Sequence, residues 1–202
     1  MKDMVVKARA KEFLNITPED EDIPDTLRYT SRGELFVIHD SGVRDPERCV
    51  ILCSTRQLGY LKKSSTWLID GTFRSAPSVF TQLITIHGLV VAKTYPLAFI
   101  LLRTKKETAY CKPLEFLKNQ LEQYQPVTII SDFEKALINS CKTIFSRSKI
   151  AGCAFHFGQA NWRKIQQLGL IRDYKTKCII YEIYQKCLNL TFFSRKPSGH
   201  NF

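Results

Sequence analysis

The sequence predicts an α/β protein whose core is a mixed five-stranded sheet flanked by helices. Three apolar segments typical of strands come first, and the spacing of apolar residues then alternates between helical and strand patterns. Strands joined by short turns pair antiparallel and strands separated by helices pair in parallel, so this order gives a sheet of both kinds. With 202 residues, 44% of them hydrophobic, the chain is long enough to bury such a core.

Residues 1–66 are predicted to form an N-terminal accessory arm. It contains an acidic, proline-containing linker at 17–25 and two apolar segments at 34–39 and 50–53 that predict short strands. A small helix is expected at 55–63.

The core is expected over residues 67–175 and begins with three strands rich in Phe, Ile, Leu and Thr. The short connection 88–93 between the second and third strands indicates a hairpin. The three strands are expected at 67–70, 79–87 and 94–102.

The second half of the core alternates helices and strands. Residues 110–124 carry apolar side chains spaced by four, three, four and three, which predicts a helix that Pro126 ends. The following elements are expected to be a strand at 127–132, helix 137–145, strand 150–153 and helix 157–168. Residues 176–202 are assigned to a C-terminal helix and a loose tail. This order is the ribonuclease-H-like layout, which other α/β folds could share.

The net charge of +11 is unevenly distributed. Residues 1–66 contain 11 basic and 11 acidic side chains, whereas residues 67–160 contain 11 and 6, and residues 161–202 contain 8 and 2. A neutral arm followed by a basic body favours a polyanionic partner, although an ordinary basic protein has the same composition.

The cysteines and apolar segments indicate a reducing compartment. There are seven cysteines with no C-x-x-C pair and no secretory leader after Met1, which favours reduced thiols in the cytosol or nucleus. Residues 75–92 lack Asp, Glu, Lys and Arg, but polar residues and a proline interrupt this run, so we expect a core strand and not a membrane span.

Two aspartates are the candidate catalytic residues because each is expected to close a strand. Asp70 ends the segment 67–70 and Asp132 ends the segment 127–132. If these strands are neighbours, the carboxylates meet at one edge of the sheet and can hold two Mg²⁺ or Mn²⁺ ions about 3.5–4 Å apart for in-line attack on a phosphodiester. The alternative is that both are turn or helix-cap residues, and Glu134 is expected to be a first-turn helix carboxylate.

Cys153 and His156 place a thiol and an imidazole three residues apart at a strand-to-helix junction. A cysteine nucleophile with a histidine base is conceivable, but nothing else in the sequence supports acyl transfer. A zinc site would need two further ligands. The available residues, none with convincing spacing, are Cys141, Cys178, His87 and His200. Spacing alone therefore favours a structural role, with zinc as the weaker alternative.

Cationic and aromatic residues alternate between 162 and 177, a pattern that can grip phosphates and stack on bases. The alternative is a solvated helix face with Trp162 turned inward. A second basic cluster lies in the loop before the first core helix. It adds little evidence for nucleic-acid binding, because cations on loops are usually solvated. The candidate nucleic-acid-binding residues are Arg163, Lys164, Arg172, Lys175 and Lys177, with Arg103, Lys105 and Lys106 in the second cluster.

Three motifs occur together in a specific order. They are Trp67-Leu68-Ile69-Asp70-Gly71-Thr72-Phe73, Ser131-Asp132-Phe133-Glu134-Lys135-Ala136 and Gly152-Cys153-Ala154-Phe155-His156-Phe157. Over residues 67–175 the sequence resembles the MULE (Mutator-like element) transposase domain. The arm also resembles what precedes this domain in animal members.

The resemblance implies a ribonuclease-H-like fold and a DDE transposase, which cleaves and transfers DNA strands with two divalent ions. Asp70 matches the first catalytic acid and metal ligand of the family, Asp132 matches the second, and Cys153 and His156 match its C-x-x-H motif. The third acid of the family is a glutamate well downstream of that motif. Glu182 lacks the family's surrounding residues, so we expect an incomplete acid set in a truncated or partial copy.

Three hypotheses remain open at this point. The preferred one is a MULE transposase fragment in the nucleus that binds DNA and Mg²⁺ or Mn²⁺, with weak or no nuclease activity. It would use no membrane and no small-molecule substrate, and it could form a homo-oligomer. The second is a non-catalytic nucleic-acid-binding protein that uses the basic face alone. The third is a zinc-stabilised interaction domain built around Cys153 and His156.

Overall fold

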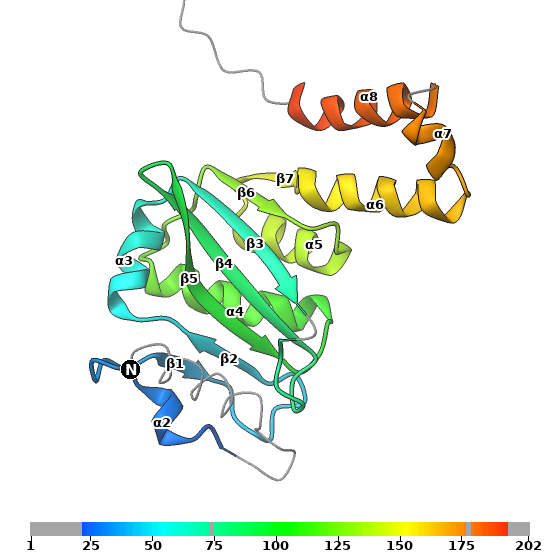
Figure 1. Ribbon diagram of the computed structural model, residues 1–202. Coiled ribbons are helices and arrows are strands. Elements are labelled where there is room, and N and C mark those ends of the chain that lie inside the picture. Colours follow the sequence, from blue (N-terminus) through cyan, green and yellow to red (C-terminus); the bar gives the residue numbers. More distant parts are fainter. Residues whose placement is uncertain (1–21, 73–74, 177–178, 194–202) are drawn as a thin grey trace, which may run out of the picture. The chain divides into compact units, whose positions relative to one another are not determined.

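The computed structural model describes residues 22–72, 75–176 and 179–193. The chain divides into two compact units, one up to Ala151 and the other from Gly152 onward. The first unit contains the sheet as far as Ala151, and the second is helical (Figure 1). The elements in order are α2 (Asp25–Arg28), β1 (Val37–Asp40), β2 (Cys49–Leu52), α3 (Thr55–Lys63), β3 (Thr66–Thr72), β4 (Gln82–Val90), β5 (Lys93–Leu102), α4 (Glu107–Gln120), β6 (Thr128–Ser131), α5 (Lys135–Ile144), β7 (Lys149–Gly152), α6 (Ala154–Gln167), α7 (Ile171–Lys175) and α8 (Ile179–Phe193).

The strands form one mixed sheet of seven strands in the order β1-β2-β5-β4-β3-β6-β7. β3 and β6 are parallel, whereas the pairs from β1 to β3 along this order are antiparallel. The predicted mixed α/β sheet flanked by helices is confirmed, but the predicted number of five strands is wrong. The two additional strands are the segments expected in the arm. β2 pairs with β5, with Ile51 opposite Ile100, and so covers the unpaired backbone groups along the outer edge of β5.

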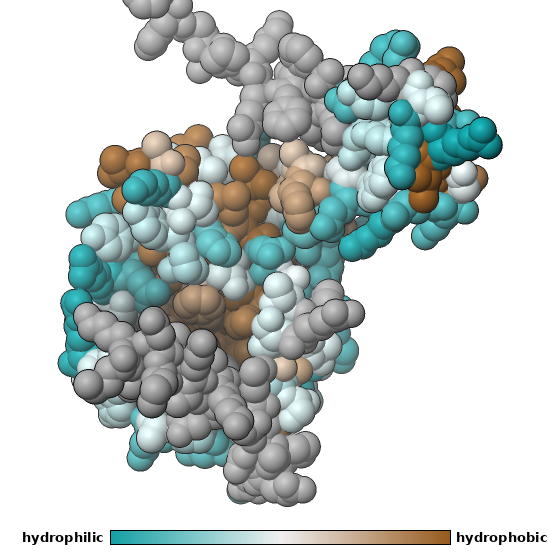
Figure 2. Space-filling model, viewed as in Figure 1, coloured by the Kyte–Doolittle hydropathy of each residue, from teal (hydrophilic) through white to brown (hydrophobic). Residues whose placement is uncertain are grey.

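The β4–β5 hairpin is tighter than the sequence predicts. Both strands extend toward the turn, so that only Val91 and Ala92 connect them, with positive φ angles of 47° and 61°. Positive φ at both central positions matches the right-handed twist of paired strands, so a two-residue turn suffices although neither residue is glycine. The turn exposes Val91, and Figure 2 shows apolar surface over this end of the hairpin.

Helix α4 ends earlier than its apolar stripe suggests. It stops at Gln120, because Glu122 and Gln123 adopt positive φ angles of 54° and 65°. Tyr124 still packs against the core from outside the helix, and its hydroxyl donates a hydrogen bond to the carbonyl oxygen of Ser64 at 2.9 Å. The apolar spacing therefore identified the buried residues correctly but not the end of the helix.

The main hydrophobic core lies between one face of the sheet and the helices α4 and α5 (Figure 1). Trp67 is fully buried there, donates from Nε1 to the carbonyl oxygen of Leu61 at 3.3 Å, and packs edge-on against Phe145. A second hydrophobic cluster lies on the opposite face of the sheet. It contains the side chains of β2 and β5 that alternate with those of the main core, together with Leu27 of α2 and Phe80. The opposite face of the sheet is therefore covered over β2 and β5.

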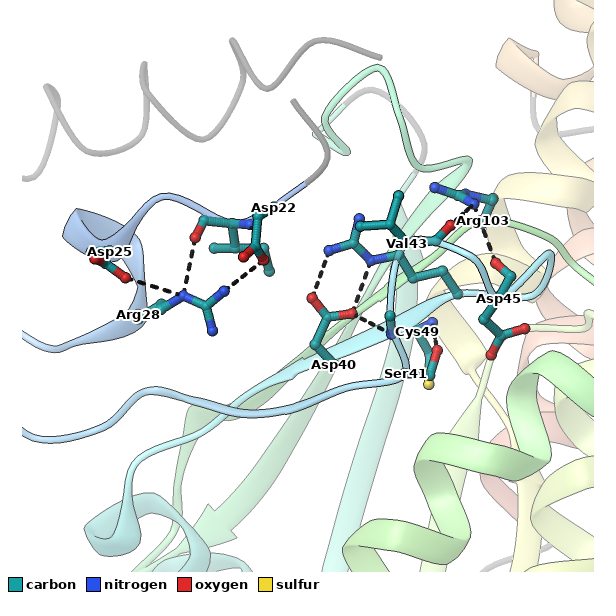
Figure 3. Close-up of polar contacts among 12 residues, drawn as sticks. Asp22, Asp25, Arg28, Asp40, Ser41, Val43, Asp45, Cys49 and Arg103 are labelled. Atoms are coloured by element: carbon teal, nitrogen blue, oxygen red, sulfur yellow. Dashed lines mark hydrogen bonds and ion pairs between the residues drawn. The ribbon is translucent and has the colours of Figure 1, made fainter. Parts of the chain in front are cut away.

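An ion pair joins the end of β1 to the residue that precedes β2. The guanidinium of Arg48 donates to both carboxylate oxygens of Asp40, at 2.9 and 2.6 Å, and only 3% of the Arg48 side chain is exposed (Figure 3). Burial alone would raise the pKa of Asp40, but the hydrogen bonds from Arg48 and from the N–H of Gly42 outweigh it and hold this pKa below its usual value. The carboxylate therefore stays charged and paired at neutral pH.

The second unit consists of α6, α7 and α8, which confirms the predicted helices near 157–168 and 179–188. Tyr174 of α7 is its aromatic centre, with ring centroids 4.9 Å from Trp162, 5.4 Å from Tyr181 and 5.4 Å from Tyr184. The predicted tail at 194–202 lies outside the described residues. Among the helices that the structure describes, none is both long enough and apolar enough to span a membrane.

Candidate active site

β3 and β6 are neighbours in the sheet and run parallel, as the hypothesis of a shared carboxylate site requires. Ile69 of β3 lies opposite Ser131 of β6, so Asp70 and Asp132 each occupy the next position along two adjacent strands. Asp132 directly follows β6, as predicted. Asp70 does not end its strand, because β3 stays paired with β4 as far as Thr72. Both aspartates are partly exposed.

Hydrogen bonds orient the carboxylate of Asp132. Its Oδ1 accepts from the backbone N–H of Glu134 at 3.2 Å. Its Oδ2 lies 3.8 Å from the position that a Cβ would take on Gly71, so this oxygen faces β3. One oxygen therefore holds the loop after β6, and the other faces the strand that carries Asp70.

Three polar side chains form a network beside this loop. The hydroxyl of Tyr110 in α4 lies 2.6 Å from Oε1 of Glu134 and 2.6 Å from Oε1 of Gln82, so its single proton is shared between two acceptors. Gln82 also donates from Nε2 to Oε2 of Glu134 at 3.4 Å. Burial and the hydrogen bond with Glu134 raise the pKa of Tyr110, so the hydroxyl remains a donor at neutral pH.

The sequence did not predict this network. Glu134 was expected to serve the first turn of a helix, but no capping hydrogen bond from its side chain is present at α5, and its carboxylate turns toward Tyr110. One signal was available, because Gln82 occupies a buried position in the alternating pattern of β4, where a polar side chain needs partners. The partners themselves lie 28 and 52 positions away and could not be identified from spacing.

Cys153 and His156 lie in the second unit, at the start of α6. Cys153 is the N-cap residue of this helix, and the ring of Phe155 packs edge-on against that of His156. Of the four further ligands considered for zinc, Cys178 and His200 lie outside the described residues, whereas His87 and Cys141 belong to the first unit. Burial raises the pKa of Cys141 to about 12, so this residue remains a thiol.

Comparison with known families locates the site within a defined domain. Residues 66–160, from the first residue of β3 into α6, match the family model of the MULE transposase domain. The match assigns these residues to the MULE transposase domain family. It includes Asp70, Asp132, Cys153 and His156, whereas β1 and β2 of the same sheet precede it. No curated protein matches the chain.

The MULE transposase family implies a divalent cation, and the donors at this site are of the right chemical kind. Carboxylate oxygens are hard ligands that suit Mg²⁺ or Mn²⁺, and here two adjacent strands supply one aspartate each. Both carboxylate oxygens of Glu134 accept hydrogen bonds, one from Tyr110 and one from Gln82. Within the described ranges, no group of three or more His, Cys, Asp or Glu could hold a metal ion. Asp70 and Asp132 are therefore donors of the right chemical kind, one from each of two adjacent strands.

The basic cluster before α4 is engaged with the arm. Arg103 donates to the carbonyl oxygens of Val43 and Asp45 at 3.0 and 3.2 Å (Figure 3), and Lys106 lies 3.7 Å from the carboxylate of Glu47. Lys105 is exposed. The structure thus gives Arg103 a structural role that its position in the sequence did not indicate.

The other basic cluster lies within the second unit. The side chains of Arg163, Lys164, Arg172 and Lys175 are all exposed, while Lys177 lies outside the described residues. Trp162 packs against Tyr174, as the inward alternative proposed. The cations of this unit are therefore accessible, but these two aromatic rings are already packed against each other.

Proposed function

We propose that the MULE transposase domain of this chain binds Mg²⁺ or Mn²⁺ through Asp70 and Asp132 and acts on DNA in the nucleus. The parallel pairing of β3 with β6, which brings the two aspartates to adjacent positions, is the observation that carries this proposal. Bound divalent ions would supply activation of an attacking hydroxyl and stabilisation of the leaving oxygen of a phosphodiester.

The protein contributes rigid and oriented ligands. Asp70 pairs with Thr85 of β4, and the preceding residue, Ile69, pairs with Ser131 of β6, so the backbone of Asp70 is held in the sheet. Asp132 has one oxygen bound to the backbone of its own loop and the other directed toward β3. Two carboxylates balance only part of the charge of two divalent ions, so we propose that the domain binds metal with weak or no strand transfer.

Replacement of both aspartates tests the metal site. We expect the double variant Asp70→Asn, Asp132→Asn to lose Mn²⁺ binding, measured by electron paramagnetic resonance of the free ion, because amides lack the charge that holds a hard cation. Asp25→Asn is the matched control, since Asp25 is exposed on α2, and it should bind Mn²⁺ as the wild type does. Equal Mn²⁺ binding by the wild type and the double variant would refute the proposal.

The basic side chains of the second unit test DNA binding. We expect replacement of Arg163, Lys164, Arg172 and Lys175 by glutamine to weaken binding to duplex DNA and to flatten its dependence on salt. Each lost phosphate contact reduces the slope of log K against log salt by about 0.9. The control variant changes Lys62, Lys112 and Lys118 to glutamine, because these lysines are bound to carboxylates or to a carbonyl oxygen within the first unit, and it should leave the slope unchanged. An unchanged slope in the first variant would place the DNA contacts elsewhere.

The same binding experiment separates the two alternative functions. DNA binding that depends on salt but is unchanged by Mg²⁺ and by the aspartate substitutions would favour a non-catalytic nucleic-acid-binding protein. Stoichiometric zinc in the purified protein, lost on replacement of Cys153 and His156, would favour a zinc-stabilised domain.

A further inference from the structure

The network of Gln82, Tyr110 and Glu134 joins three elements that are distant in the sequence. Gln82 begins β4, Tyr110 lies in α4, and Glu134 immediately precedes α5. The side chains of Gln82 and Tyr110 are fully buried, and their polar atoms are satisfied by one another and by Glu134. Buried polar groups that are hydrogen-bonded to one another resist displacement, because movement leaves a buried polar atom without its partner.

The network is connected to both strands that carry the aspartates. Glu134 donates its backbone N–H to Oδ1 of Asp132, so the residue held by Tyr110 also holds the carboxylate. On the other side, the amide of Gln82 lies directly against Gly71, since a Cβ on this glycine would be 2.1 Å from Nε2. Gly71, which follows Asp70, therefore lies against Gln82, and Glu134, two residues after Asp132, is hydrogen-bonded to Gln82 and Tyr110.

We propose that Tyr110 and Gln82 are positioning residues, which fix the loop after β6 through Glu134 and so keep Oδ2 of Asp132 directed toward β3. This inference rests on the proposed function, in which Asp132 is a metal ligand. Replacement of a residue that orients a metal ligand through hydrogen bonds commonly lowers the metal affinity by about 10-fold or more. Glu134 itself acts here through its bonds to Tyr110, Gln82 and Asp132.

Two variants of unchanged charge test the inference in the full-length chain. Tyr110→Phe removes only the hydroxyl, and Gln82→Met removes the amide at similar volume. Tyr124→Phe is the matched control, because its hydroxyl also donates one hydrogen bond but to Ser64, away from this loop. Hydrogen–deuterium exchange of the metal-free protein measures the loop, and Mn²⁺ binding measures the ligand.

We expect the amides of residues 131–135 to exchange about five-fold faster in Tyr110→Phe and in Gln82→Met, and not in Tyr124→Phe. Mn²⁺ binding should weaken about 10-fold in the first two variants alone. Exchange rates equal to those of Tyr124→Phe would overturn the inference whatever the metal data show, and so would faster exchange with unchanged Mn²⁺ affinity. Faster exchange in a protein whose wild type binds no Mn²⁺ would uphold the positioning of the loop and refute the metal site instead.

Discussion

Replacement of Arg48 by methionine is expected to lower the free energy of unfolding by about 3–5 kcal/mol, because it leaves the Asp40 carboxylate without its partner in a largely buried site. The substitution also removes a cation–π contact, since the guanidinium carbon lies 5.7 Å from the centroid of the Phe80 ring. Urea unfolding followed by circular dichroism at neutral pH measures the difference.

The ion pair between Arg28 and Asp22 is the matched control for Arg48. Its distance is the same, 2.6 Å, but 76% of the Asp22 side chain is exposed. Water screens such a pair, so Arg28→Met should cost about 1 kcal/mol or less. Equal losses in the two variants would show that burial does not strengthen the contribution of the Arg48–Asp40 pair.

The Arg48–Asp40 pair also predicts a pH dependence. The pKa of Asp40 is lower in the folded protein than its value of 3.8 in the unfolded chain. A depressed carboxyl pKa stabilises the fold above the unfolded pKa, and this contribution is lost as the pH falls through the folded pKa. In Arg48→Met, burial raises the pKa of the unpaired Asp40, so the stability difference from wild type should be largest at neutral pH, begin to shrink above pH 3.8 and continue to shrink below it. A difference that stays constant down to pH 2 would contradict this assignment.

Replacement of Gly71 by alanine should both destabilise the protein and weaken Mn²⁺ binding. The new Cβ would lie 2.1 Å from Nε2 and 3.3 Å from Cδ of Gln82, so the buried amide must move away from Glu134 and Tyr110. We expect a loss of about 1–3 kcal/mol in the free energy of unfolding, as is usual for overpacking of a core. Urea unfolding and Mn²⁺ titration measure the two effects.

Gly59→Ala is the control for the backbone effect of this substitution. Gly59 lies inside α3, and a Cβ there would meet no atom within 4 Å. Alanine is the better helix former, so this variant should gain about 0.5–1 kcal/mol. If Gly71→Ala were as stable as the wild type, Gln82 would be mobile enough to move aside, and the network would not be rigid.

Local patterns predicted the elements and their order because these depend on nearby residues. All of the segments predicted as strands and all of the core helices appear close to their expected positions, since a spacing of two or of 3.6 residues is a property of the segment itself. Ends were less accurate. α4 stops at Gln120 because two residues with positive φ follow Leu121, and β3 continues past Asp70 because β4 pairs with it.

The sequence by itself determined the α/β class, the candidate aspartates and the resemblance to the MULE transposase domain. Each of these depends on residues that are close together in the sequence. Only the tertiary structure decided that β1 and β2 extend the sheet to seven strands, that Arg103 binds carbonyl oxygens of the arm, and that Tyr110 and Gln82 meet Glu134. The physical reason is that strand partners and buried polar contacts are chosen by which groups meet in the folded core. Residues as distant as Arg103 and Val43, 60 positions apart, are hydrogen-bonded there, and no local spacing predicts that pairing.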